Sequence, residues 1–325
     1  MTSVVEPLLE VEGLVKHFTS HRTLFQRKAA PIRAVDGVTF SINEGETFAL
    51  VGESGCGKTT VAKMILLLEL PTMGVIKFRG RNVHNLKGRD LRGYKRSVQA
   101  VFQDPYSSLD PRMRVLDIIG EPLQIQLGMS GRALRMRVSE LLENVGLSSE
   151  AGANYAHQFS GGQRQRIAIA RSLALQPQLI VLDEPVSGLD VSIRAQILNL
   201  LGELQKNHGL SYLLISHDLA IVEHMSNMVG VMYVGKMAEM TTKDELFRDS
   251  LHPYTSALMA SVPQPDPDIP MGTTISGEVA SPINPPSGCR FHPRCPLYED
   301  SNICRDLEPD WREVKTGHMV ACHKV

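Results

Sequence analysis

The strongest constraint on how this chain folds is a glycine-rich segment between a short apolar run and a helical pattern. The segment Gly52-Glu53-Ser54-Gly55-Cys56-Gly57-Lys58-Thr59 follows the apolar run Thr47–Val51, and Thr59–Glu69 has the pattern of a helix. This placement of G-x-x-x-x-G-K-[ST] predicts a loop whose backbone amides surround phosphate groups. In such a loop Lys58 reaches the β- and γ-phosphates, and the Thr59 hydroxyl ligates Mg²⁺. Cys56 is an interior loop position, where an inert thiol is favoured over a redox switch.

A second glycine-containing turn, Ser160-Gly161-Gly162-Gln163, opens a helical pattern much further along the chain. Ser160 can cap that helix, and two glycines allow the backbone to come close to a ligand. The exposed N–H groups and the helix dipole then make an anion site. The chain therefore has two predicted phosphate-binding devices, and the first does not explain the second.

Two carboxylates follow the apolar run Leu179–Leu182, which has the length of a buried strand. A strand of a parallel sheet delivers the side chains at its carboxyl end into the crevice where ligands bind. We expect Asp183 to hold Mg²⁺ and Glu184 to polarise the attacking water as the general base. A surface acidic turn is the alternative, but it leaves the apolar run unexplained.

Three single residues extend this prediction, each with a plain alternative. Gln103 follows another apolar stretch and could reach Mg²⁺ and the attacking water, although a lone glutamine is more often an ordinary surface residue. His217 follows the run Tyr212–Ser216, where a histidine is usually structural. Phe18 could stack on an adenine ring or could be a half-buried core aromatic.

Apolar runs typical of strands alternate with helical patterns along most of the chain. A mostly helical stretch runs from Pro105 to about Gln176, with expected turns at Gly128, Gly146 and Gly152. This order predicts a doubly wound α/β core interrupted by a helical insert. The expected strands are Leu8–Phe18, Ala34–Ile42, Thr47–Val51, Val75–Phe78, Leu179–Leu182 and Tyr212–Ile215.

Composition restricts the partners. The formal net charge of −1 over 325 residues gives no support to a nucleic-acid partner held by bulk charge. No apolar run approaches the roughly 18 residues of a membrane span. The first residues, Met1–Gly13, carry three glutamates and no apolar core of a secretory signal. These features predict a cytoplasmic protein that reaches a membrane only through a partner.

The last part of the chain, residues 261–325, is here called the tail and differs in composition from the rest. From about Ser261 prolines become frequent, which predicts an extended linker rather than a regular packed domain. Four cysteines follow with the spacing C-x5-C-x8-C-x17-C, namely Cys289, Cys295, Cys304 and Cys322. A reducing compartment argues against disulfides, and the loose spacing suits an iron–sulfur cluster better than a zinc finger. Zinc stays an alternative, with mixed ligation open through His292, His318 and His323.

Taken together, these motifs resemble the ATP-binding cassette (ABC) family over roughly Leu8–Ala260. The order matches throughout, from Phe18 and the glycine-rich loop to Gln103, the Ser160–Gln163 signature, Asp183-Glu184, Ser187-Gly188-Leu189-Asp190 and His217. Gly188, where alanine is commoner, is a small departure. The resemblance implies a P-loop NTPase (RecA-like) α/β fold that binds ATP and Mg²⁺. Residues 1–260 would form the ATPase domain with a helical subdomain at about 105–176, and residues 261–325 a proline-rich linker and cysteine-bearing extension.

In this family two cassettes face each other head to tail, and the signature of one closes on the γ-phosphate held by the other. The resemblance therefore gives the second phosphate device a ligand on a neighbouring cassette. It also gives Asp190 a role across the dimer interface and gives His217 a contact with the γ-phosphate. It implies Mg²⁺ ligation by Thr59, Gln103 and Asp183. The nucleotide would be bound by Phe18, Gly52, Glu53, Ser54, Gly55, Cys56, Gly57, Lys58, Thr59, Thr60, Ser160, Gly161, Gly162, Gln163 and Asp190.

Three segments narrow the resemblance to the oligopeptide/dipeptide, nickel and opine importers, and most closely to their F-type ATPase subunit. They are Val101–Met113, His252–Thr255 and Gly277–Pro296. Ala156, where this branch often has proline, is a departure near the signature. Members of the branch carry a [4Fe-4S] cluster at the tail cysteines. The implied partners are two transmembrane permease subunits, a second ATPase subunit that is either a paralogue or an identical copy and, indirectly, an extracytoplasmic substrate-binding protein. The chain would lie peripherally on the cytoplasmic face of the inner membrane.

Two functions of other classes compete with that of an energy-coupling ATPase for peptide import. A soluble cassette protein acting on ribosomes or DNA would have two cassettes in one chain or a long coiled-coil insert, and this chain has neither. A metal-sensing module with a degenerate cassette is disfavoured because Lys58, Asp183, Glu184 and His217 are intact. Nickel, opine or another small substrate stays open in place of peptide.

Overall fold

The structure is a computed structural model that describes residues 6–19, 31–103, 109–260, 277–298 and 302–325. The described chain divides into two compact units. Unit 1 consists of the described residues among 1–42, 47–84 and 215–325. Unit 2 consists of the described residues among 43–46 and 85–214. The start of the expected helical stretch after Gln103 and most of the proline-rich linker lie outside the described residues.

An antiparallel sheet of four strands forms one part of unit 1. Its order is β2-β1-β4-β5, with Leu9 opposite Ile42 on one side and Phe78 on the other. The alternating pattern of β2 fits this sheet because every second residue from Val38 to Ile42 is buried. The strands are β1 (Leu9–Phe18), β2 (Ile32–Ile42), β4 (Met73–Phe78) and β5 (Arg81–Asn82).

A second group of strands in unit 1 carries the glycine-rich loop. Its order is β11-β12-β10-β9-β3, and β3 is parallel to β9 whereas the other pairs are antiparallel. All five residues of β3 are buried, as its apolar run predicts. The rings of Phe40 on β2 and Phe48 on β3 stack with centroids 4.6 Å apart, so the two sheets share a core. The strands are β3 (Thr47–Val51), β9 (Met228–Tyr233), β10 (Lys236–Thr242), β11 (Arg312–Lys315) and β12 (His318–Val320).

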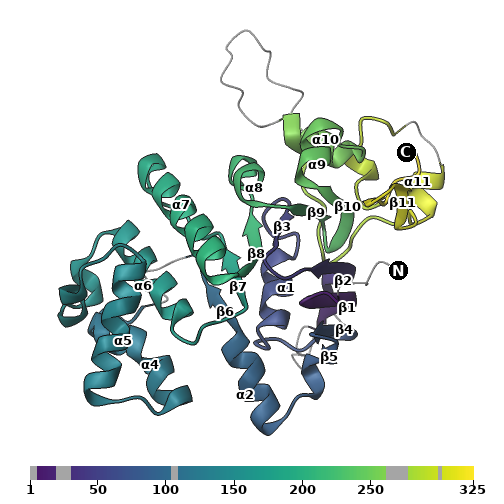
Figure 1. The fold of residues 1–325 in the computed structure, drawn as a ribbon. Helices are drawn as coiled ribbons and strands as arrows, with labels where there is room; N and C mark the ends of the chain where they lie inside the picture. The colour runs from purple at the N-terminus through teal and green to yellow at the C-terminus, as the bar shows by residue number, and fades with distance from the viewer. Residues whose placement is uncertain (1–5, 20–30, 104–108, 261–276, 299–301) are drawn as a thin grey trace, which may run out of the picture. The chain divides into compact units, whose positions relative to one another are not determined.

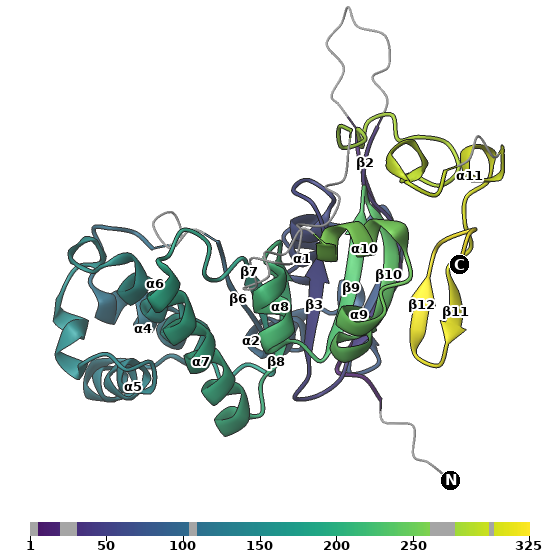
Figure 2. The ribbon, with the colours of Figure 1, turned by 90° about the horizontal axis from the view of Figure 1, so that it is seen from above.

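Short helices surround these strands. Helix α9 packs against β9 and β10, and α10 packs against β10 (Figure 2). Helix α1 begins directly after the glycine-rich loop and is shorter than the pattern predicts, because Leu67 turns into the left-handed region with φ 57°. The helices of unit 1 are α1 (Lys58–Ile65), α8 (Leu219–Met225), α9 (Lys243–Arg248), α10 (Pro253–Ala260) and α11 (Asn302–Asp306), with 3₁₀ turns at Val83–Asn85 and His292–Arg294.

The cysteine-bearing tail is joined to this unit by a hairpin that sequence analysis did not predict. Strand β12 pairs with β10, with Val320 opposite Glu239. The carboxylate of Glu239 is fully buried and accepts hydrogen bonds from the backbone N–H groups of Leu251 and His252. It also lies 2.6 Å from His318 Nε2 on β12. The tail is therefore held by a strand pairing and by a buried polar contact.

Unit 2 combines three neighbouring strands with a set of helices. The strand order is β8-β7-β6, and β6 pairs in parallel with β7. Helices α4, α5 and α6 pack against one another in this unit (Figure 1). The strands are β6 (Val98–Val101), β7 (Leu179–Asp183) and β8 (Ser211–Ser216), with helices α2 (Gly88–Ser97), α4 (Val115–Leu127), α5 (Gly131–Asn144), α6 (Gly161–Leu173) and α7 (Val191–His208) and 3₁₀ turns at Ser149–Ala153 and Ala156–Gln158.

The glycines expected to break the helical stretch behave in two ways. Gly128 ends α4 in the left-handed conformation with φ 66°, and Gly146 has φ 71° after α5. Gly152 instead lies inside a 3₁₀ turn, so the turn expected there is part of a short helix.

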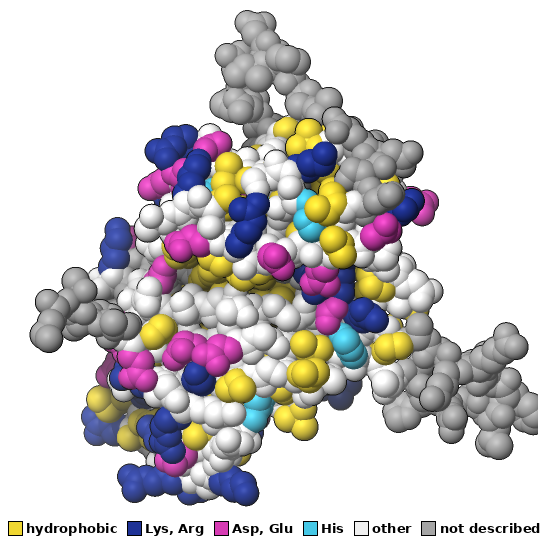
Figure 3. Space-filling view, turned by 90° about the vertical axis from the view of Figure 1, so that its right-hand side faces the viewer, with side chains coloured by type: hydrophobic (Ala, Val, Ile, Leu, Met, Phe, Trp, Pro, Cys, Tyr) yellow, Lys and Arg dark blue, Asp and Glu magenta, His cyan; other side chains and the backbone are white. Residues whose placement is uncertain are grey.

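Charge is mixed on the surface that Figure 3 draws. Lysine and arginine side chains are interspersed with aspartate and glutamate on this face. That pattern agrees with the formal net charge of −1.

Candidate functional site

The glycine-rich loop leaves buried β3 and leads into α1. Gly52 has φ 148° and Gly57 has φ 112°, a region that other residues rarely adopt. A Cβ at Gly52 would collide with the carbonyl oxygen of Met232, and one at Gly57 with that of Ala34. Glycine is therefore required at both positions for the loop to lie against its neighbours.

Lys58 points into this loop. Its side chain is buried, and Nζ donates hydrogen bonds to the carbonyl oxygens of Gly52 at 2.5 Å and Glu53 at 3.0 Å. The ammonium group therefore lies within the curve of the loop, where phosphate oxygens would be its partners. Lys58 is the first residue of α1, and Thr59 and Thr60 follow it in the same helix.

Cys56 carries the thiol of the loop. The thiol is buried, and burial raises its pKa, although the nearby Lys58 acts in the opposite direction. A thiol with a raised pKa is a poor nucleophile at neutral pH. This supports an inert Cys56.

Phe18 and His217 also belong to unit 1. Phe18 ends β1 and is half-buried, with Lys16 Nζ 4.8 Å from the centre of its ring. His217 follows the last residue of β8 and is exposed. Their roles toward a nucleotide stay predictions.

Unit 2 brings the predicted carboxylates and the predicted glutamine together. Strand β7 is buried throughout and ends at Asp183, whose side chain is also buried. Gln103 follows β6, which pairs with β7. Its side-chain Nε2 donates a hydrogen bond of 2.7 Å to Oε2 of Glu184. The weak signal at Gln103 therefore leads to a residue in contact with the predicted general base.

Glu184 has an unusual backbone conformation. Its φ is 48°, the left-handed region in which a non-glycine residue is uncommon. Such residues cost of order 1–3 kcal/mol and gather at active sites, where the surrounding structure holds them. Leu67, Arg79, Gln176 and Val234 also have a positive φ, so the role of Glu184 stays a prediction.

The signature turn begins α6 as predicted. The Ser160 hydroxyl accepts from the backbone N–H of Gln163 at 3.4 Å, and the Gln163 side chain accepts from the N–H of Ser160 at 3.0 Å. This reciprocal pair is a capping box. Ser160 and Gln163 are exposed.

The two signature glycines pack against the segment that carries Asp190. A Cβ at Gly161 would lie 3.3 Å from Leu189, and one at Gly162 would collide with Ile193 on α7. Asp190 is exposed and occupies the N-cap position of α7. The signature and the Asp190 segment thus form one surface within unit 2.

The four tail cysteines lie in unit 1 and are free thiols. Burial raises the pKa of Cys289 to about 11, and Cys322, Cys295 and Cys304 add to the rise. Burial also raises the pKa values of Cys295 and Cys322, again with contributions from the other thiols. The backbone N–H of Cys289 donates a hydrogen bond of 2.9 Å to the carbonyl oxygen of Cys304, which brings these two residues together. Within the described ranges, however, no three His, Cys, Asp or Glu residues are arranged to hold a metal ion.

Sequence reasoning missed two residues that contact the glycine-rich loop. The Tyr254 hydroxyl accepts a hydrogen bond from the backbone N–H of Glu53, and Arg294 pairs with the Glu53 carboxylate. Both lie in the segments His252–Thr255 and Gly277–Pro296 that narrow the resemblance. No local signal connects either residue to a loop so distant in the chain.

Two family models match the chain. "ABC transporter" matches residues 35–187, and "Oligopeptide/dipeptide transporter, C-terminal region" matches residues 238–304. YkfD of Bacillus subtilis is 50% identical over 321 residues, which are 98% of this chain and 95% of YkfD. The Oligopeptide transport ATP-binding protein AppF of the same organism is 48% identical, with 98% and 97% covered.

Solved structures of ABC cassettes are also similar to this chain. CbiO1 of Clostridium perfringens, part of the ABC transporter complex CbiONQ, has a TM-score of 0.63 and 27% identity, covering 75% of this chain and 92% of CbiO1. The ATP-binding cassette MJ0796, solved as a dimer with ADP and Pi, has a TM-score of 0.63 and 27% identity, with 72% and 98% covered.

The fold and the motif residues define an ATP-hydrolysing cassette of the P-loop NTPase class. The chain belongs to the ABC transporter family, in the group that carries the oligopeptide/dipeptide transporter C-terminal region. This membership implies ATP and Mg²⁺ as substrate and cofactor. In the part of the chain that the structure describes, no helix is long and apolar enough to cross a membrane.

Proposed function

We propose that this chain is the ATP-hydrolysing subunit that drives the import of di- or oligopeptides through a separate membrane permease. The observation that carries the proposal is full-length similarity to the Oligopeptide transport ATP-binding protein AppF, tail included. Cassettes of many functions share the loop, the signature and the carboxylates. The tail match at residues 238–304 supports the peptide branch in particular.

Different residues of the chain bind the nucleotide, hold the Mg²⁺ and activate the attacking water. The amides of Gly52–Thr60 and the Lys58 ammonium bind the phosphates of ATP, and Phe18 stacks on the adenine. Thr59, Asp183 and Gln103 would hold the Mg²⁺, which neutralises charge on the phosphates. Glu184 takes the proton of the attacking water, and His217 contacts the γ-phosphate. The buried carboxyl group of Asp183 and the Gln103–Glu184 hydrogen bond support these assignments.

The signature acts on the nucleotide of a second cassette. Ser160–Gln163 and Asp190 would lie across a head-to-tail dimer interface, and the exposure of Ser160, Gln163 and Asp190 is compatible with this. The dimeric structure of the cassette MJ0796 supports the pairing of two cassettes. The isolated chain should therefore bind ATP and hydrolyse it slowly.

The assembly follows from this role. The proposed partners are two transmembrane permease subunits, a paralogous second ATPase subunit and, indirectly, an extracytoplasmic binding protein. This chain would lie peripherally on the cytoplasmic face of the membrane. Residues 1–260 act as the ATPase domain, the helical subdomain at about 105–176 docks on the permease, and residues 261–325 form the extension. Affinity purification of the tagged chain from detergent-solubilised membranes should recover the permease and a second cassette. Recovery of ribosomes instead would reject the transport function.

We also propose a [4Fe-4S] cluster on Cys289, Cys295, Cys304 and Cys322, with zinc as the alternative. The four cysteines are free thiols, and a backbone hydrogen bond from Cys289 to Cys304 brings two of them together, which supports a common ligand set. Ligation would require the side chains to move closer than they lie here, since no metal-holding group exists among the described residues. Anaerobic purification should give a brown protein with stoichiometric iron and sulfide. A colourless protein with one zinc per chain would reject the cluster.

A further inference from the structure

The second residue of the phosphate-binding loop is held by a residue of the cysteine-bearing tail. Arg294 Nη1 lies 2.8 Å from Oε2 of Glu53, and Nη2 lies 3.0 Å from Oε1, a bidentate pair. The Arg294 side chain is only 6% exposed and that of Glu53 23% exposed. A paired geometry with little exposure fixes the direction of the carboxylate more firmly than a surface ion pair does.

The backbone of Glu53 is fixed from the same side. Its N–H donates a hydrogen bond of 3.0 Å to the hydroxyl of Tyr254. The Tyr254 ring packs at 4.7 Å from Tyr233 and at 5.3 Å from Phe291, and Arg294 also donates to the Tyr233 hydroxyl at 3.3 Å. Because Phe291 and Arg294 both belong to the tail, the tail supplies part of the wall on which the loop rests.

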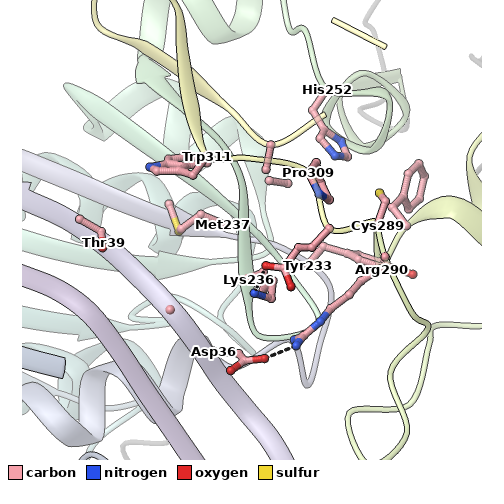
Figure 4. A pocket seen from close by; sticks show the side chains of 16 residues that line it. Asp36, Thr39, Tyr233, Lys236, Met237, His252, Cys289, Arg290, Pro309 and Trp311 are labelled. Atoms are coloured by element: carbon pink, nitrogen blue, oxygen red, sulfur yellow. Dashed lines mark hydrogen bonds and ion pairs between the residues drawn. The ribbon is translucent and has the colours of Figure 1, made fainter. Parts of the chain in front are cut away.

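The arginines that anchor the tail stand next to cysteines. Arg294 directly precedes Cys295, and Arg290 directly follows Cys289. Arg290 pairs with Asp36 and donates to the carbonyl oxygen of Val234, and Figure 4 shows this side chain reaching from the tail toward Asp36. Any change in the order of the segment between the two cysteines is therefore transmitted to both anchors.

Arg294 also neutralises the negative charge of the Glu53 carboxylate. A carboxylate within a loop that binds the phosphates of ATP repels the ligand unless a cation neutralises it. The guanidinium group supplies that charge and keeps the carboxylate oxygens turned toward itself. Losing Arg294 would leave the charge unpaired and the loop less ordered, and both effects weaken binding.

We infer that Arg294 is a positioning residue of the ATP site, and that through its pair with Glu53 the tail and the nucleotide stabilise each other's order. The inference rests on the ATP-binding role of the loop. Linkage makes the coupling reciprocal: if the docked tail strengthens ATP binding, bound ATP strengthens docking of the tail. Effects of this kind commonly change affinity by about 5- to 150-fold.

The first test is the equilibrium Kd for Mg-ATP of the full chain and its variants. Arg294→Gln should raise the Kd about tenfold, and Arg294→Lys should restore part of the affinity by keeping the charge. Arg305→Gln is the matched control, since Arg305 follows Cys304 but pairs within the tail with Asp306. It should leave the Kd within about twofold of wild type, below the range expected for coupling.

A double-mutant cycle with Glu53→Gln separates a specific pair from general damage. The double variant should bind ATP no more weakly than Arg294→Gln, because removing the carboxylate also removes the unpaired charge. Additive losses, or an unchanged Kd in a folded Arg294→Gln variant, would overturn the inference.

The second test reads the tail itself. Backbone hydrogen exchange between Gly288 and Cys295 should slow when ATP is added to wild type and should not respond in Arg294→Gln. An exchange rate that stays the same in wild type when ATP is added would overturn the coupling. The proposed function fails separately, if the wild-type chain does not bind ATP at all.

Discussion

The side-chain amide of Gln103 donates a hydrogen bond of 2.7 Å to the carboxylate of Glu184, two residues that stand 81 positions apart in the chain. Gln103 lies after β6, and the chain that follows it continues to α4. The contact therefore gives the proposed general base a direct partner at the start of the helical stretch. A change in that stretch that moved Gln103 would alter the environment of Glu184.

Replacement of Glu184 by Gln removes the base and keeps the size of the side chain. Hydrolysis should fall by about 10²–10⁴-fold, the usual contribution of general base catalysis, whereas the Kd for ATP should stay near the wild-type value. Phosphate release and equilibrium binding measured on the same preparations check this. Turnover at the wild-type rate would reject Glu184 as the base.

The close packing of Gly162 on Ile193 predicts a site-specific effect of a single methyl group. Gly162→Ala should displace the start of α6 because its Cβ meets Ile193 at once. The signature would shift, so ATP hydrolysis by the assembled importer should fall while ATP binding by the isolated chain persists. Ile193→Ala in the same chain should restore part of the activity by making room.

Gly202 provides the matched control for that variant. It lies in α7 with nothing near its Cβ direction. Gly202→Ala should keep activity and stabilise the chain by about 0.5–1 kcal/mol, since alanine is the better helix former. An equal loss of activity in both variants would show that the signature packing has no special role.

His252 predicts a loss of stability in mild acid. Burial lowers its pKa to about 4 from the ordinary value of 6.5, and a hydrogen bond to the backbone of Ala321 opposes this in part. Between pH 6.5 and 4 His252 binds a proton in the unfolded chain but not in the folded chain. Its contribution to the free energy of unfolding is therefore complete above pH 6.5 and is lost as the pH falls toward 4. The shift corresponds to roughly 3 kcal/mol.

Urea unfolding at several pH values checks the contribution of His252. The free energy of unfolding should fall between pH 6.5 and 4 in wild type, and His252→Asn should flatten that slope even though it lowers the stability at neutral pH. Equal slopes in the two proteins would contradict the assignment.

Local patterns in the sequence predict the parts of the site that local chemistry builds. The apolar runs before Gly52 and Asp183 are buried strands, and Ser160 caps the helix that its turn was expected to open. Each of these features depends on residues within a few positions of one another.

Features that depend on distant pairing were not predicted. The antiparallel sheet of β1, β2, β4 and β5 and the pairing of β12 with β10 arise from which strands meet, and an alternating pattern does not specify a partner. The Arg294–Glu53 pair joins residues 241 positions apart, and nothing around either residue indicates the other. Proline frequency likewise did not predict that the tail would add a hairpin to the sheet.

The measurement that tests the account most directly is peptide uptake by the complete importer reconstituted in liposomes. With this chain, its permease, its second cassette and the binding protein present, addition of Mg-ATP on the cytoplasmic side should drive accumulation of a labelled di- or oligopeptide. The same liposomes carrying Glu184→Gln should bind ATP and accumulate no peptide. ATP-driven uptake that persists with Glu184→Gln, or ATP hydrolysis in the wild-type complex that moves no peptide, would contradict the account.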